Sequence, residues 1–279
     1  MADTPRTPDT PETPADSPAS GRRLAILIPA RDEVDRLPRA LRDFERALED
    51  GPWTIVTILV ADNGSTDGTS DVAETVGREL GLPVDARRYP VRGKAAAVCR
   101  GLADIAADHG PERHGPHGME HHPPTVDWVL VADADSATDP TVLRRMDPGP
   151  GELWVASRHM PGASIARPSG FAPARELMSA AMRLLVRLLF GFPVDDTQCG
   201  FKLIPIGAAG PLGRTVASRS WVFDVELLAR AQHLGLRLVA FPVDWADVAV
   251  SKVKPVTDSI GSLVDLLRIR LRLTRERVG

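Results

Sequence analysis

Long hydrophobic runs are missing from this sequence, and cysteine is nearly so. No apolar run approaches the roughly 18 residues that a helix needs to cross a bilayer. Cys99 and Cys199 are the only cysteines among 279 residues, so no disulfide framework is expected and a reducing compartment fits. The first residues lack the apolar segment of a secretory signal. We therefore expect a cytoplasmic protein.

An excess of positive charge is also absent, as are two common nucleotide-binding motifs. The formal net charge is −3, so we expect no nucleic-acid partner for the chain as a whole. No Gly-x-Gly-x-x-Gly follows the first predicted strands, and no Gly-x-x-x-x-Gly-Lys-Ser/Thr occurs. These absences disfavour a dinucleotide-dependent dehydrogenase and a P-loop enzyme.

The composition divides the chain into three parts. Residues 1–21 repeat Thr-Pro and Ser-Pro, cannot bury enough apolar surface to offset their ordering entropy, and are expected to be disordered. Residues 22–258 form the main domain. Within it, residues 109–124 are rich in His, Gly and Pro and lack cysteine partners for zinc, which indicates a flexible insertion. Residues 259–279 are expected to form a basic amphipathic helix.

The main domain begins with repeated strand–turn–helix units. Residues 24–29 and 54–61 are apolar strands, and a polar turn and an apolar repeat of helical spacing follow each. Repeated βα units favour an α/β fold with a mostly parallel sheet. Asp62 follows the second strand directly, where it is positioned to accept hydrogen bonds from a base or a ribose.

The most informative stretch is residues 126–136. Its Val- and Leu-rich run has the character of a buried parallel strand and stops at Asp133 and Asp135, which one residue separates. Ligands in open α/β sheets bind outside the carboxyl ends of such strands. Two neighbouring carboxylates repel each other unless a cation lies between them, and Mg²⁺ or Mn²⁺ on a diphosphate is a natural partner. An acidic turn that ends a strand is the alternative interpretation.

Two basic residues are expected near the same crevice. Lys94 precedes a predicted helix over residues 95–107, where it is placed either to meet a phosphate or to lie in solvent. Arg158 follows a predicted strand over residues 153–156 and faces the crevice.

Two further helices combine apolar and basic stripes. The helix predicted over residues 174–190 is consistent with core packing beneath snorkelling arginines or with contact to anionic lipid headgroups. The helix predicted over residues 260–278 fits an interfacial helix or a docked helix with a solvated basic face. Their stripes comprise Leu177, Ala181, Leu184, Leu185 and Leu188 against Arg175, Ser179, Arg183 and Arg187, and then Leu263, Leu267 and Leu271 beside five arginines.

Eight short blocks follow one another along the chain: residues 28–33, 62–69, 92–94, 133–138, 157–158, 196–202, 223–228 and 251–252. Each block alone is weakly specific, and their order along the chain is the strong signal. Taken together they resemble the polyprenyl- and dolichyl-phosphate sugar synthases, which are inverting nucleotide-sugar glycosyltransferases of the GT-A fold. Among them the sequence is most similar to the dolichyl-phosphate glucose synthases, over residues 24–272.

The resemblance implies a Rossmann-like GT-A fold and a role for each matching position. The nucleotide pocket would comprise Pro29, Ala30, Glu33, Asp62, Lys94 and Lys252, with Lys252 near the donor phosphates. The metal ligands would be Asp133 and Asp135, and the acceptor-phosphate contacts Arg158, Arg175 and Ser179. The residues implied in catalysis are Asp133, Asp135, Arg158 and Arg175. The sequence departs from the family at Val250, where glycine is usual, in its histidine-rich insertion and in lacking a membrane-spanning anchor.

The reaction implied is metal-dependent, inverting transfer of a hexose, glucose from UDP-glucose, onto a polyprenyl monophosphate. A peripheral position on the inner face of the membrane would follow. Two alternatives stay open: a soluble GT-A transferase with a small-molecule or nucleoside acceptor, and a non-enzymatic nucleotide-sugar-binding protein.

Overall fold

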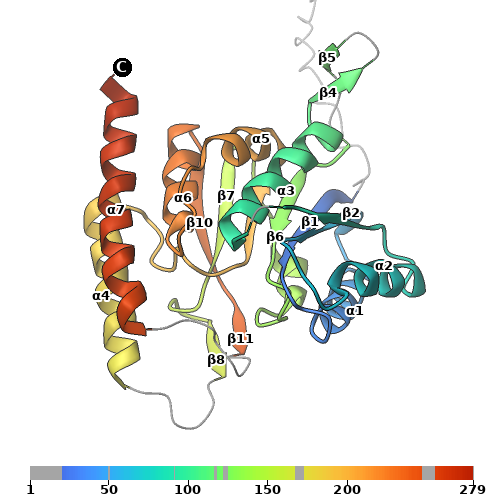
Figure 1. Ribbon diagram of the computed structural model, residues 1–279, viewed down its shortest axis with the longest axis horizontal. Coiled ribbons are helices and arrows are strands. Elements are labelled where there is room, and N and C mark those ends of the chain that lie inside the picture. Colours follow the sequence, from blue (N-terminus) through green and yellow to red (C-terminus); the bar gives the residue numbers. More distant parts are fainter. Residues whose placement is uncertain are drawn as a thin grey trace, which may run out of the picture.

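A seven-stranded sheet lies at the centre of the protein, with helices on both faces (Figure 1). The computed structural model describes residues 21–49, 51–90, 92–115, 118–121, 125–166, 173–246 and 255–278. The strand order is β10-β7-β9-β6-β1-β2-β3, and every pairing is parallel except those of β9. The predicted α/β fold with a mostly parallel sheet is confirmed. Residues 1–20 of the predicted tail lie outside the described residues.

The elements of the sheet and its helices have the following bounds. The strands are β1 (Arg22–Ala30), β2 (Trp53–Asp62), β3 (Val84–Arg88), β6 (Trp128–Val131), β7 (Glu152–Ser157), β9 (Lys202–Pro205) and β10 (Arg237–Pro242). The helices are α1 (Leu37–Leu48), α2 (Thr69–Glu79), α3 (Lys94–His109), the short 3₁₀ helix η1 (Pro140–Arg145), α4 (Pro173–Phe190), α5 (Ile206–Thr215), α6 (Phe223–His233) and α7 (Pro255–Val278). A separate parallel pair joins β8 (Ser164–Ala166) to β11 (Asp244–Ala246).

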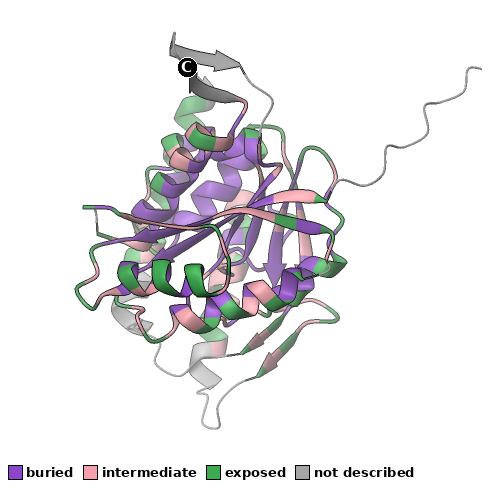
Figure 2. Ribbon diagram, turned by 90° about the vertical axis from the view of Figure 1, so that its right-hand side faces the viewer, coloured by how far each residue is buried: buried purple, intermediate pink, exposed green. Residues whose placement is uncertain are grey.

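Strand β1 shows why the sheet is covered on both faces. Leu24, Ile26 and Ile28 belong to the core under α1 and α2, whereas Ala25 and Leu27 belong to the core under α3, α5 and α6. The alternation follows from the two-residue period of a strand. All five side chains are fully buried, and burying a leucine or isoleucine contributes roughly 1.5–3 kcal/mol. The buried strands form the centre of the molecule in Figure 2.

Strand β9 is the one reversal in the sheet. It runs antiparallel between β6 and β7, and Lys202 at its start pairs with Val131 and with Val155. Lys202 therefore enters the sheet beside the carboxyl ends of β6 and β7. This reversal brings a basic side chain to the edge where the predicted carboxylates lie.

The histidine-rich segment contains more regular structure than the sequence predicted. Strands β4 (Glu112–Gly115) and β5 (Gly118–His121) pair as an antiparallel hairpin, and the flexibility of residues 109–124 stays a prediction. The stretch is polar and without clear periodicity, which is why it gave no strand signal.

The C-terminal helix α7 begins at Pro255, before the predicted residue 259, and contacts α4 (Figure 1). Its side chains Leu266, Ile269 and Leu273 face the core. Elsewhere in the core, Cys99 and Cys199 are both buried and form no disulfide. No helix in the described parts of the chain is long and apolar enough to cross a membrane.

Helix α4 turns three of its five leucines outward. Leu177, Leu184 and Leu188 are 73%, 58% and 75% exposed, so the interpretation of this stripe as core packing is wrong for these three residues. Among the described side chains of α4, Val186 is buried and Leu185 is partly buried against the core. Helices α4 and α7 both expose apolar side chains, and we call these side chains together the α4–α7 surface. They are Leu177, Met178, Leu184, Leu188, Leu263, Val264, Leu267 and Leu271.

Candidate active site

The predicted site residues gather at the carboxyl edge of the sheet. Ala30 ends β1 and lies beside Asp62, which ends β2, because the parallel register pairs these two residues. Asp133 and Asp135 follow β6, and Arg158 follows β7. Sequence reasoning placed each of these residues at a strand end, and the structure agrees.

The loops after β1 and β2 are joined by reciprocal hydrogen bonds. The backbone N–H of Asp32, which has a φ of 52°, donates to Ser65 Oγ over 3.0 Å, and Thr66 N–H donates to Asp32 Oδ1 over 3.0 Å. Glu33 N–H donates to Thr69 Oγ1 over 3.0 Å. The positive φ of a non-glycine residue is a strained conformation, and these bonds hold it. The two loops thus form one rigid rim.

Asp62 lies beneath this rim and is only 1% exposed. Its carboxylate accepts hydrogen bonds from Ser65 N–H at 2.8 Å and from the Ser70 hydroxyl. Burial alone would raise the pKa of Asp62, but these two hydrogen bonds lower it below the usual value. An ionised acceptor therefore lies across the sheet from Ala30, with Pro29 one residue before it in β1 and Glu33 in the rim. Its contact with a nucleotide stays a prediction.

Lys94 is the first residue of α3 and points at the carboxylate pair. Gly93 adopts a φ of 116°, which only glycine adopts readily, and its N–H donates to Asn63 Oδ1 over 2.8 Å. Lys94 Nζ lies 2.5 Å from Asp133 Oδ1, so the interpretation of Lys94 as a solvated loop residue is wrong. Burial would lower the pKa of Lys94, but Asp133 and Asp224 raise it, and the ammonium stays charged.

Asp133 and Asp135 line one cavity with Ser136. A Cβ at Gly200 would overlap the Asp133 carboxylate, so glycine makes room for it. Burial would raise the pKa of Asp133, but Lys94, Lys202 and Arg158 lower it; burial and Asp133 raise the pKa of Asp135. The two carboxylates of the cavity thus differ in pKa, which is lowered for Asp133 and raised for Asp135.

These residues fit a divalent cation that takes its remaining ligands from the substrate and from water. Ser136 Oγ is buried without a hydrogen-bond partner among the described residues, and Ser136 adopts a φ of 53°. In the described ranges no group of three or more His, Cys, Asp or Glu side chains is placed to hold a metal. Two carboxylates leave most of an octahedral shell to water and phosphate oxygens, as Mg²⁺ and Mn²⁺ sites on nucleotides require.

A buried ion pair lies next to this cavity, and sequence reasoning assigned it no role. Lys202 is 1% exposed, and its Nζ donates to Asp224 Oδ1 over 2.7 Å and to Cys199 O over 2.6 Å. Both residues stand in blocks that carry the family resemblance, which was the available signal. Asp224 lies in the first turn of α6 and so fixes that helix against the site.

Arg158 is held rigidly on the other side of the site. Its Nε and Nη2 donate to the two oxygens of Asp196 over 2.7 and 2.9 Å, and its guanidinium lies 5.2 Å from the ring centroid of Trp245. Burial would lower the pKa of Arg158, but Asp196 raises it. Trp245 also lines the cavity of Asp133, so the two regions adjoin.

A second cavity contains Arg158 and the inner face of α4, and we call it the acceptor cavity because the predicted acceptor-phosphate contacts Arg158 and Ser179 line it. Arg183 Nη1 lies 2.8 Å from Ser179 Oγ and 3.1 Å from His159 Nε2, and burial and Arg183 lower the pKa of His159. Arg183 therefore points inward, not toward the surface. The lining residues are Arg158, His159, Ser179, Met182, Arg183, Val186, Asp196, Thr197 and Gln198.

The structure thus brings Arg158 and Ser179 together, as predicted. Arg175 belongs to α4, but its side chain is not among those described, and Lys252 lies outside the described residues. The roles of these two residues stay predictions.

Asp196→Asn is expected to raise the KM for the acceptor about tenfold while changing kcat less than threefold. The substitution removes the charge that orients Arg158, and a charge-assisted hydrogen bond contributes about 1.5–3 kcal/mol. Steady-state kinetics with varied acceptor measure the effect, and Asp195→Asn on the exposed neighbour is the control. An unchanged KM would mean that Arg158 does not contact the acceptor.

A mostly parallel sheet with an Asp-x-Asp pair at the carboxyl end of one strand is the arrangement of the GT-A class of nucleotide-sugar glycosyltransferases. Comparison with known proteins agrees with this assignment. Residues 25–146 match the family described as Glycosyl transferase family 2. Dolichyl-phosphate beta-glucosyltransferase of Homo sapiens is 32% identical over 275 residues, which covers 92% of this chain and 77% of the human protein. The chain therefore belongs to glycosyl transferase family 2 and is a glycosyltransferase.

Two further comparisons extend the match. Dolichyl-phosphate beta-glucosyltransferase of Dictyostelium discoideum is 27% identical over 271 residues, covering 92% of this chain and 76% of that protein. Among solved structures, glucosyl-3-phosphoglycerate synthase of Mycobacterium tuberculosis, in complex with Mn²⁺, UDP-glucose and phosphoglyceric acid, superimposes with a TM-score of 0.56. At 19% identity, over 90% of this chain and 80% of that one, this likeness concerns the fold alone.

Proposed function

We propose that this glycosyltransferase moves glucose from UDP-glucose onto a polyprenyl monophosphate, with inversion at the anomeric carbon. The names of the curated relatives support a glucosyl donor and a dolichyl-phosphate acceptor. The observation that carries the proposal is the two-sided helix α4. Its inner face lines a cavity with two guanidinium groups, and its outer face exposes leucines. A lipid phosphate needs both a cationic pocket for its head and an apolar surface for its chain.

The chemistry follows from the charges at the site. An oxygen of the acceptor phosphate attacks the anomeric carbon while the bond from that carbon to the diphosphate oxygen breaks, which inverts the configuration. The acceptor is already anionic near pH 7, so no strong general base is needed. Arg158 and Arg183 orient the incoming phosphate through charge-assisted hydrogen bonds from their guanidinium groups.

A divalent cation, Mg²⁺ or Mn²⁺, belongs to this proposal, with Asp133 and Asp135 as its ligands. The ion would supply Lewis-acid stabilisation of the charge on the departing diphosphate. Lys94 already lies against Asp133 and contributes a fixed positive charge from the N-terminus of α3. Lys202 is expected to stabilise the same negative charge, because it lies close enough to Asp133 to lower the pKa of that carboxylate.

A peripheral position on the inner face of a membrane is the third element. The α4–α7 surface exposes eight large apolar side chains, and the exposed residues of α7 include Arg268, Arg270 and Arg275. An apolar face flanked by arginines favours the interface of an anionic bilayer. This surface would hold the enzyme where its acceptor resides.

A panel of donors and acceptors tests the reaction. UDP-glucose with a short-chain polyprenyl phosphate and Mn²⁺ or Mg²⁺ is expected to give the fastest release of nucleoside diphosphate. GDP-mannose and metal-free reactions are the controls. If a water-soluble phosphorylated acceptor or a nucleoside proves at least as good as the polyprenyl phosphate, the small-molecule alternative replaces the lipid.

Leu184→Glu with Leu267→Glu is expected to reduce flotation with vesicles that contain phosphatidylglycerol at least tenfold. Each leucine buried in the interface contributes roughly 1.5–3 kcal/mol, and a carboxylate adds repulsion. Leu234→Glu is the matched control, because Leu234 is 48% exposed but lies outside the α4–α7 surface. Equal flotation of the double variant and the control would remove the membrane from the proposal.

A further inference from the structure

A second basic hollow lies away from the carboxylate pair. It has a volume of about 670 Å³ and is bounded by the end of β3, one side of α3, the last turn of α5 and the connection between α5 and α6. We call it the arginine groove, and it shares no lining residue with the cavity of Asp133 or the acceptor cavity. Its lining comprises Arg87, Arg88, Tyr89, Pro90, Ala96, Cys99, Arg100, Ala103, Gly213, Arg214 and Arg219.

The five arginines of the groove are not equally neutralised. Arg87 pairs with Asp85 and Asp108, Arg88 with Asp71, and Arg100 with Asp104. These three side chains therefore form its neutralised side.

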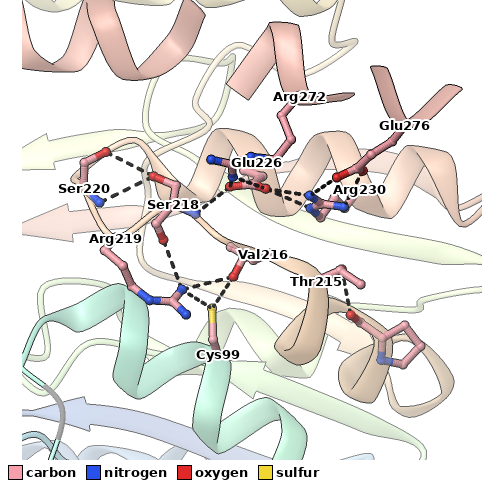
Figure 3. A network of polar contacts seen from close by, with 11 residues as sticks. Cys99, Thr215, Val216, Ser218, Arg219, Ser220, Glu226, Arg230, Arg272 and Glu276 are labelled. Carbon is pink, nitrogen blue, oxygen red and sulfur yellow. Dashed lines mark hydrogen bonds and ion pairs between the residues drawn. The ribbon is translucent and has the colours of Figure 1, made fainter. Parts of the chain in front are cut away.

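Arg214 and Arg219 form the side that lacks compensating charge. Within the described parts of the chain, neither has a carboxylate partner. Arg219 uses only Nη1, which donates to Val216 O at 3.0 Å, to Ser218 O at 3.3 Å and to Cys99 Sγ at 3.8 Å (Figure 3). Its Nε and Nη2 make no hydrogen bond to a described residue. The guanidinium is thus fixed in place with its remaining donors available.

Such an arrangement suits a phosphate-bearing ligand. Guanidinium groups present planar donor pairs that match phosphate oxygens, and a hollow of this size fits a small molecule. The groove is not a thiol site, because burial raises the pKa of Cys99 to about 11 and keeps the thiol protonated near neutral pH. We propose that the arginine groove binds a small anion of the diphosphate class, at a site separate from that of the sugar donor.

The segment that carries Arg219 also connects two other regions. Ser218 N–H donates to Glu226 over 2.7 Å, and Gln198 Nε2, from the acceptor cavity, donates to Trp221 O over 3.3 Å. An anion bound to Arg219 therefore restrains residues 216–222. This segment connects the acceptor cavity to Glu226, whose carboxylate accepts a hydrogen bond from Arg272 of α7. Backbone amides in this segment exchange more slowly when the groove is filled.

Calorimetric titration of the metal-free full-length protein with inorganic pyrophosphate tests the site. The wild type is expected to bind pyrophosphate at least fivefold more tightly than inorganic phosphate. Arg214→Gln with Arg219→Gln weakens binding at least tenfold and abolishes the slower hydrogen exchange of residues 216–222. Arg214→Gln alone weakens binding at least threefold, and it threatens no described hydrogen bond. Arg78→Gln, on an exposed arginine of α2, changes the affinity less than twofold.

Lys94→Met separates the groove from the donor site, because Lys94 faces the carboxylate pair. It is expected to leave the affinity for pyrophosphate within twofold of the wild type. The proposal is overturned if the wild type does not bind pyrophosphate, or if it binds phosphate as tightly. It is also overturned if Lys94→Met abolishes binding while the double arginine variant keeps it.

Discussion

Asp135→Asn is expected to lower turnover about 100- to 1,000-fold and to weaken Mn²⁺ binding. Asp135 lines the cavity that it shares with Asp133, and loss of one of the two proposed metal ligands would remove several kcal/mol of stabilisation from the leaving group. A loss of roughly 3–4 kcal/mol corresponds to this range of rates. Nucleoside diphosphate release measures turnover, and titration with Mn²⁺ followed by electron paramagnetic resonance measures the metal affinity.

The same variant is expected to fold at least as well as the wild type. Burial and Asp133 raise the pKa of Asp135, so the folded protein holds its ionised form at a cost. This cost is fully present above the raised pKa and disappears as the pH falls below the unfolded value, and asparagine removes it near neutral pH. The thermal midpoint of the metal-free variant should therefore equal or exceed that of the wild type.

Asp139→Asn is the matched control for both measurements. Asp139 is exposed, and its side chain caps η1 by accepting a hydrogen bond from Thr141 N–H, a role that asparagine retains. Its turnover is expected to stay within twofold of the wild type. Turnover of Asp135→Asn within fivefold of the wild type would show that Asp135 does not hold a metal that the reaction needs.

The strand ends could be predicted from the sequence because they depend on local pattern. Apolar β-branched runs that stop at Asp62 and Asp133 mark the carboxyl edge of a parallel sheet, and the structure places both residues there. The resemblance added residues such as Ser179, which local pattern alone could not connect to Arg158. The structure brings both into one cavity.

The orientation of α4 could not be predicted, because it depends on partners that lie far away in the sequence. Its arginines and leucines recur at similar spacing, so either stripe could face inward. Arg183 faces inward because His159 and the acceptor cavity lie there, and Leu184 is left outside. A pattern read from one helix carries no information about these neighbours.

Lys202 shows a second limit of sequence reasoning. A strand of four residues can run in either direction, and only the antiparallel course of β9 brings Lys202 to the site. Lys202 and Asp224 are 22 residues apart, with helix α5 between them, so the sequence alone did not indicate that the two residues pair. The local sequence pattern thus locates the carboxyl edge of the sheet, whereas the ion pairs at that edge can be identified only once the fold is known.

Glu226→Ala is expected to destabilise the protein by about 3–5 kcal/mol, which lowers the thermal midpoint by about 10 °C. Glu226 is fully buried on α6, and its carboxylate accepts hydrogen bonds from Arg230 at 2.9 Å, Arg272 at 3.1 Å and Ser218 N–H at 2.7 Å (Figure 3). Alanine leaves the guanidinium groups without this counterion, and among the described carboxylates Arg230 then pairs with Glu276 alone. Removing one partner of a buried ion pair costs more than the pair contributes.

Two further measurements assign this loss to the docking of α7. Arg272→Ala and the double variant complete a mutant cycle, in which a coupling energy above about 1 kcal/mol is expected because the groups touch. Amide exchange in α7 should accelerate more than exchange in β1. Glu74→Ala, on an exposed residue of α2, should change the stability by less than about 0.5 kcal/mol. If Glu226→Ala matches that control, Leu266, Ile269 and Leu273 alone hold α7, and the ionic contacts are incidental to its position.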